Sequence, residues 1–122
     1  MIRTRYESVR PYVTRDGSLV RELLHPTQHG NVGQSLAEAE IAPGATTHLH
    51  YHNQSEELYH IVAGQGLMQL GAEQFSVAVG DTVCIPPGTH HCITNTAATP
   101  LRILCCCAPP YTHDDSVLVQ AP

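Results

Sequence analysis

The stretch GATTHLHYHNQSEELYHIVAG, residues 44–64, decides how this chain folds. His48, His50 and His52 are two residues apart, so on a β-strand their side chains leave the same face. Glu57 follows five residues after His52, and the residues between them are typical of a turn. Such a turn would fold the chain back and bring the Glu57 carboxylate beside the imidazoles. The stretch therefore predicts a hairpin that carries histidines and a carboxylate on one face.

A second pair of histidines offers a further ligand. His90 and His91 are adjacent, and adjacent residues of a strand face opposite ways, so one of the two is expected to point inward. Strand parity alone does not say which. Imidazoles with one carboxylate suit Mn, Fe, Co, Ni, Cu or Zn better than Ca or Mg, which prefer oxygen ligands. We expect one divalent transition metal ion, held octahedrally by four side chains with two adjacent positions open for water, a chelating substrate or dioxygen.

The rest of the chain has the pattern of an antiparallel β protein. Short extended runs recur at intervals of roughly 8 to 12 residues, each bounded by Gly, Pro or Asn, and no amphipathic helix stands out. The pattern predicts an all-β sandwich or barrel. The expected strands are 6–13, 18–24, 35–41, one ending near residue 52, 57–62, 67–70, 74–79, 82–85, 90–94 and 101–107.

The length of the chain predicts a single domain. A chain of 122 residues corresponds to one domain, since domains usually have roughly 100 to 150 residues. We expect N-terminal strands and a loop over 1–34, the barrel over 35–107, and a tail over 108–122 that is irregular or forms one helical turn.

Composition excludes several classes of function. The net charge is −5 and all six cations are Arg, which argues against nucleic-acid binding. Without Lys, neither Schiff-base chemistry nor a Walker-type phosphate loop is possible. No apolar run is long enough to span a membrane, and the N-terminus lacks the apolar core of a signal peptide. Five cysteines, three of them consecutive, do not resemble a disulfide framework, so we expect a cytoplasmic protein.

Two spaced motifs resemble those of the cupin superfamily. The first consists of Gly44, five residues, His50, one residue, His52, four residues, Glu57, six residues and Gly64. The second, in GDTVCIPPGTHHCITN, consists of Gly80, five residues, Pro86, one residue, Gly88, two residues, His91, three residues and Asn95. Every motif position is filled.

The resemblance implies a jelly-roll β-barrel with an interior metal held by His50, His52, Glu57 and His91. The resemblance thus implies that His91, rather than the adjacent His90, points inward. His48 is in phase with these ligands but outside the minimal motif. It is expected either to support the ligands or line a substrate pocket, or to be a polar residue at the rim of the barrel.

Other side chains have two interpretations each. Tyr59 shares strand phase with Glu57, so it is either a donor in the substrate pocket or a core aromatic. His60 should face the other way, packed or at an interface. The His113 to Asp115 cluster either caps the barrel mouth or is solvated. The cysteines are expected to be small buried apolar residues rather than metal ligands; they are Cys84, Cys92, Cys105, Cys106 and Cys107.

Two classes of function fit such a site. The first is a metal-dependent enzyme acting on a small organic molecule that chelates the metal, of the dioxygenase, decarboxylase or isomerase/cyclase type, with Glu57 as a possible base. The alternative is a non-catalytic module that binds a small metabolite. The low charge content predicts uncharged surface and a homodimer, and resemblance to other small cupins implies exchange of N-terminal strands between subunits.

Overall fold

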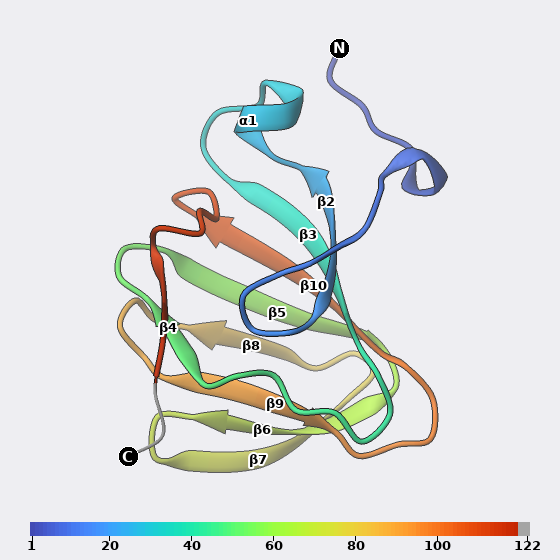
Figure 1. The fold of residues 1–122 in the computed structure, drawn as a ribbon, viewed down its shortest axis with the longest axis vertical. Coiled ribbons are helices and arrows are strands. Elements are labelled where there is room, and N and C mark those ends of the chain that lie inside the picture. Colours follow the sequence, from blue (N-terminus) through green and yellow to red (C-terminus); the bar gives the residue numbers. More distant parts are fainter. Residues whose placement is uncertain (120–122) are drawn as a thin grey trace.

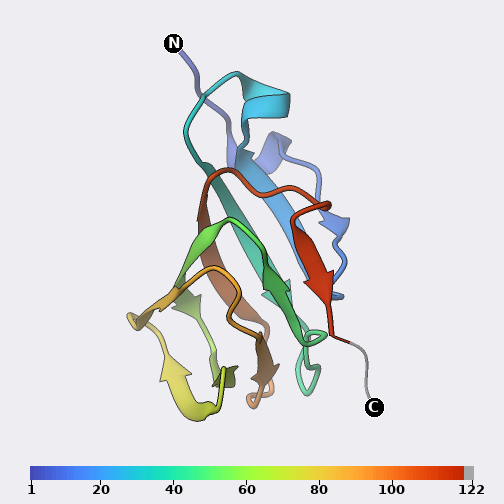
Figure 2. The ribbon, with the colours of Figure 1, turned by 90° about the vertical axis from the view of Figure 1, so that its left-hand side faces the viewer.

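The computed structural model, which describes residues 1–119, consists of two antiparallel β-sheets packed against each other (Figure 1). The first sheet has six strands in the order β1-β2-β3-β10-β5-β8, and the second has five in the order β11-β4-β9-β6-β7. The jelly-roll β architecture expected from the sequence is confirmed. In both views the N-terminal segment lies at one end of the long axis and the β6–β7 hairpin at the other (Figure 2).

The strands follow the predicted runs closely over the barrel. The six-stranded sheet contains β1 (Tyr12–Val13), β2 (Leu19–Leu24), β3 (Ser35–Ile41), β5 (Glu56–Ala63), β8 (Thr82–Ile85) and β10 (Leu101–Ala108). The five-stranded sheet contains β4 (His50–His52), β6 (Gln65–Leu70), β7 (Glu73–Ala78), β9 (His91–Asn95) and β11 (Ser116–Leu118).

The core lies between the sheets because buried and outward residues alternate along each strand. In β10, every second residue from Leu101 to Cys107 is buried. The largest buried apolar side chains come from both sheets; they include Ile61, Met68, Ile85, Ile93, Leu101 and Ile103. Their packing fixes the register, and with it the face on which the motif histidines lie.

Two motif residues outside the ligand set have structural roles. Gly64 has φ +84°, and a Cβ atom there would approach the Pro100 carbonyl oxygen to 2.9 Å, so only glycine fits. Asn95 is buried and donates through Nδ2 to the carbonyl oxygens of Ile41 (3.0 Å) and Thr99 (2.8 Å). Both residues therefore hold the strand connections at one end of the barrel.

The prediction of a strand over 6–13 is wrong in its first half. Residues Tyr6–Ser8 form a 3-10 helix, η1, and only β1 is extended. The amides of Ser8 and Val9 bond to carbonyls three residues back. The Tyr6 hydroxyl donates to the Glu38 carboxylate at 2.6 Å. This contact to β3 lies far along the chain, so local propensity could not reveal it.

Two further segments differ from expectation. The predicted loop over 25–33 contains a one-turn helix, α1 (Pro26–His29), with proline in its first turn and the His25 side chain accepting from the Thr27 amide. The sequence predicts a tail that is irregular or forms one helical turn, yet β11 pairs with β4, with Ser116 opposite His52. Residues 120–122 of the tail lie outside the described residues. None of the helices in residues 1–119 has the length and apolar character needed to cross a membrane.

Candidate metal centre

Four buried side chains from three strands converge between the sheets. His50 and His52 project from β4, Glu57 from β5, and His91 from the start of β9, where it pairs directly with His50. One donor atom from each lies within 4.8 Å of the other three. His91 is fully buried and His90 is exposed, so the inward member of the pair is the one that the motif implied.

Backbone carbonyls orient two of the imidazoles. His50 Nδ1 lies 2.8 Å from the carbonyl oxygen of His48, and His91 Nδ1 lies 2.9 Å from that of Thr89. Because a carbonyl oxygen only accepts, each Nδ1 must carry the proton, which leaves the Nε2 lone pair free toward the centre. His91 Nε2 is buried and has no hydrogen-bond partner. An unused lone pair in a dry site is the state that a metal ligand requires.

The carboxylate of Glu57 links the group. Oε1 lies 3.2 Å from His52 Nε2 and 3.5 Å from His91 Nε2, and Oε2 accepts from Cys107 Sγ at 3.3 Å. Burial alone would raise the pKa of Glu57, but the hydrogen bond from His52 and the electrostatic attraction of the His52 and His91 imidazoles outweigh it and lower the pKa to about 2. The carboxylate is therefore ionised and able to act as a metal ligand.

The two β4 histidines have opposite pKa shifts. Burial lowers the pKa of His50, and the charge of His91 adds to this. At His52, burial also disfavours the charged form, but the hydrogen bond to Glu57 outweighs it and raises the pKa. The His52 imidazole therefore tends to carry a proton, and this proton lies where a metal cation would bind.

These residues fit a transition metal ion. Donors bound at about 2.0 to 2.2 Å from a common ion lie about 3 to 4.4 Å apart, depending on whether they are adjacent or opposite. The observed separations within 4.8 Å require only small movements to reach that geometry. The donor set of three imidazoles and one carboxylate suits the ions that the sequence predicted.

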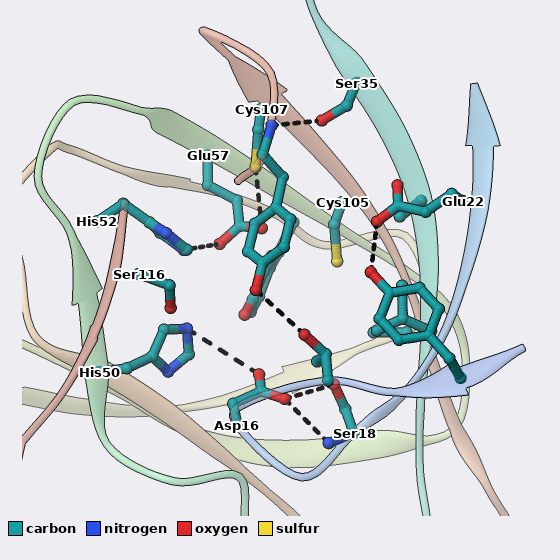
Figure 3. Close-up of a pocket in the computed structure, with 17 residues that line it drawn as sticks. Asp16, Ser18, Glu22, Ser35, His50, His52, Glu57, Cys105, Cys107 and Ser116 are labelled. Carbon is teal, nitrogen blue, oxygen red and sulfur yellow. Dashed lines mark hydrogen bonds and ion pairs between the residues drawn. The ribbon is translucent and has the colours of Figure 1, made fainter. Parts of the chain in front are cut away.

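Three of the four side chains, His50, His52 and Glu57, line a cavity of about 50 Å³ (Figure 3). Tyr59 lines this cavity beneath the histidines, with its ring centroid 6.0 Å from that of His91. His48 is exposed and does not line it; its carbonyl, not its ring, supports His50. His60 turns away from the cavity and bonds through Nδ1 to Thr82 Oγ1 at 2.7 Å.

Most residues of the cavity lining were not predicted from the sequence, Asp16 and Tyr111 among them. Asp16 Oδ2 lies 4.0 Å from His50 Nε2. Tyr111 belongs to the tail and contributes a hydroxyl that meets Thr14 Oγ1 at 3.1 Å. Asp16 lies in the turn between β1 and β2, and Tyr111 precedes β11; β1 and β11 are edge strands of the two sheets, and no local spacing signals that these segments meet at the cavity.

The cysteines take three kinds of position. Cys105 and Cys107 are buried as expected, and Cys92 and Cys106 are half-buried. Cys84 is exposed on β8, so the expectation of burial there is wrong: its strand faces it outward, away from the buried Ile85. Within residues 1–119 the candidate metal ligands include no cysteine.

Comparison with known proteins identifies the family of this chain. The model of the cupin domain family matches residues 37–107. An uncharacterized protein of Methanocaldococcus jannaschii is 51% identical over 98% of this chain and 96% of its own length. An oxalate-binding protein of Thermotoga maritima is 29% identical over 70% of this chain and 67% of its own length. The polyketide cyclase RemF of Streptomyces resistomycificus superposes with a TM-score of 0.82 at 21% identity, covering 100% of this chain and 87% of RemF. With both motifs filled and the barrel formed, the chain belongs to the cupin domain family.

Proposed function

We propose that this protein is a metal-dependent enzyme that acts on a small organic molecule chelating one divalent transition metal ion. The observation that carries the proposal is the convergence of His50, His52, Glu57 and His91, three of which (His50, His52 and Glu57) line a cavity between the sheets. Four protein ligands leave an octahedral ion with two positions for substrate oxygens. When bound, the ion would polarise a coordinated hydroxyl, carbonyl or carboxylate.

The chain's own groups would position the substrate and exclude water. The cavity is narrow, so bound molecules of few atoms would displace most of its solvent. Tyr59 and Tyr111 would contribute aromatic walls and hydroxyls. We propose a second role for Glu57 as a base, because its carboxylate lies on the wall of the cavity that would hold the substrate.

The alternative function is a non-catalytic module that binds a small metabolite. The relative from Thermotoga maritima named as an oxalate-binding protein favours this alternative, because its name states binding and no reaction. The two functions predict the same metal and the same cavity, so only product formation separates them.

Elemental analysis followed by a substrate screen tests the proposal. Protein purified without added metal is expected to contain about one transition metal ion per chain. The metal-loaded protein is then incubated in air with diketones, phenols and sugar acids, while oxygen uptake and product masses are followed. Product formation supports the enzyme, whereas tight binding without product supports the binding module. Protein that retains no transition metal would contradict both.

Substitution Glu57→Gln separates the base from the ligand. The amide keeps a ligand oxygen but cannot accept a proton, so we expect turnover to fall by a factor of about 100 or more in protein that still contains metal. Turnover is measured per bound metal ion. Unchanged turnover at full metal content would show that Glu57 is not the base.

A further inference from the structure

The cavity contains several carboxylates and, among its lining residues, no cationic side chain. Asp16, Glu22 and Glu57 all line it, and neither Arg nor Lys does. Arg15 lies in the adjacent turn, but its guanidinium donates to the carbonyl oxygens of His113 (2.8 Å) and Ser116 (3.1 Å). Three carboxylates against one divalent ion leave one net negative charge when the imidazoles are neutral.

The Glu22 carboxylate lies where it would interact with the charge of a bound ligand. Its side chain comes from β2, across the cavity from His50 and His52 (Figure 3), and the residue is 4% exposed. Oε1 accepts from the Tyr12 hydroxyl at 2.7 Å, while Oε2 is buried without a hydrogen-bond partner. A buried carboxylate with an unused acceptor is unfavourable unless a donor or a positive charge approaches it.

Asp16 presents a second acceptor between Glu22 and the histidines. Its Oδ1 accepts from the backbone amide and the hydroxyl of Ser18, at 2.9 and 2.6 Å. Its Oδ2 is 4.0 Å from His50 Nε2, which is beyond hydrogen-bond distance. Apart from these two carboxylates, the polar groups of this part of the lining are neutral hydroxyls, and an anionic ligand would find no Arg or Lys side chain among the lining residues.

We propose that the site selects a small neutral or cationic ligand that donates hydrogen bonds, such as an amine or a polyhydroxyl compound, and rejects dicarboxylates. This inference rests on the proposed function, since it names the class of molecule that the metal site takes. One end of the ligand would coordinate the metal, and its donor end would face Glu22 and Asp16. The selectivity comes from the fixed negative charge of the cavity, which acts strongly on a ligand because Glu22 and Glu57 are buried.

Binding of three small probes of different charge tests the inference. The metal-loaded protein is titrated calorimetrically at pH 7 with ethanolamine (a cation), glycolamide (neutral) and oxalate (a dianion). Because oxalate binds metals more strongly than the others in water, the informative quantity is the change in each Kd on substitution. In Glu22→Gln, the amide keeps the contact with Tyr12 but removes the charge. We expect oxalate to bind about tenfold more tightly, ethanolamine about tenfold more weakly, and glycolamide to change less than threefold.

Two further variants complete the experiment. Glu73→Gln removes the same charge from an exposed position outside the cavity and should leave all three Kd values within twofold. If Glu22→Gln does not fold, Asp16→Asn carries the same expectation, because the amide oxygen can still accept from Ser18. An oxalate affinity that is unchanged or weaker in the folded cavity variant would overturn the inference. Failure of the proposed function can be told apart from failure of this inference. The former would appear as protein without metal or as a substrate screen without product, and the probe titrations measure neither.

Discussion

Cys107 shows how one side chain can act on the centre through another. Its Sγ lies 3.3 Å from Glu57 Oε2, while Oε1 faces the histidines. Burial raises the pKa of the Cys107 thiol, so the sulfur stays protonated and donates. The contact leaves Oε1 available for the metal and fixes the orientation of the carboxylate.

Removing this donor is expected to weaken metal binding. Cys107→Ala should raise the metal Kd by about tenfold, as changes to groups that orient metal ligands usually do, whereas Cys107→Ser should keep it within about threefold. The Kd is measured by competition with a chromophoric chelator. Cys105→Ala is the matched control, because this buried thiol contacts the Ile103 carbonyl instead of Glu57. Equal effects of alanine and serine at position 107 would refute the orienting role.

At the scale of elements, the tail completes the wall of the cavity. Strand β11 adds to the edge of β4, and Tyr111 and Ser116 line the cavity beside His52. Asp115 fastens this strand to the turn after β4, since its two carboxylate oxygens accept from the amides of Gln54 (2.9 Å) and Ser55 (3.1 Å). The turn that reverses the chain between His52 and Glu57 is therefore stabilised by the Asp115 carboxylate, which belongs to another segment of the chain.

Loss of the Asp115 carboxylate should destabilise the fold locally. Asp115→Ala removes both acceptors and is expected to lower the free energy of unfolding by about 1 to 2 kcal/mol, with Asp115→Asn intermediate because the amide keeps one acceptor. Urea denaturation measures the difference. Asp114→Ala, an exposed neighbour, should change the stability by less than about 0.5 kcal/mol. Equal stability of the two alanine variants would show that the turn is not held by this carboxylate.

At the scale of the whole molecule, a metal held by the four candidate ligands would join strands from both sheets. Its ligands lie on β4 and β9 of one sheet and β5 of the other. A ligand that binds only the folded state stabilises it, by about 2.7 kcal/mol when the free ligand is at 100 times its Kd. Removal of metal with a chelator should lower the melting temperature by on the order of 10 °C, as followed by circular dichroism. Addition of metal should restore it. His91→Ala should melt at one temperature with or without the chelator; a persistent difference would place the stabilising ion elsewhere.

The outer face of the six-stranded sheet favours self-association. Leu36, Cys106, Leu58 and Cys84 are register partners across four adjacent strands, so they form one apolar row on this face. Leu58 is 38% exposed despite its size. We propose that a second copy of the chain covers this row in a homodimer. Exchange of N-terminal strands stays a prediction; β1 and β2 form one edge of this sheet.

Sedimentation velocity tests the dimer. At micromolar concentration the protein should sediment with the mass of two chains. Leu58→Arg should sediment with the mass of one chain, because burying a guanidinium in the interface without an anionic partner is unfavourable. Leu67→Arg is the control: Leu67 is also 38% exposed but lies on β6 of the other sheet. A wild-type protein with the mass of one chain would contradict the proposal.

Part of the site could be predicted because its rules are local. The two-residue period of a strand placed His50 and His52 on one face, and the turn before Glu57 placed its carboxylate beside them. Asp16, Tyr111 and Cys107 could not be found in this way. Their places depend on which segments become neighbours in space, and one-dimensional periodicity contains no information on that.

The sequence by itself determined the strand pattern, the two motifs and the four residues that can hold a metal, because these depend on spacing along the chain. Only the tertiary structure decided that the ring of His48 stays outside the cavity and that the tail becomes a strand. It also decided that carboxylates of the N-terminal turn and β2 face the metal ligands. The physical reason is that charge and solvation in a cavity depend on which residues surround it in space, and those residues come from segments remote from one another along the chain.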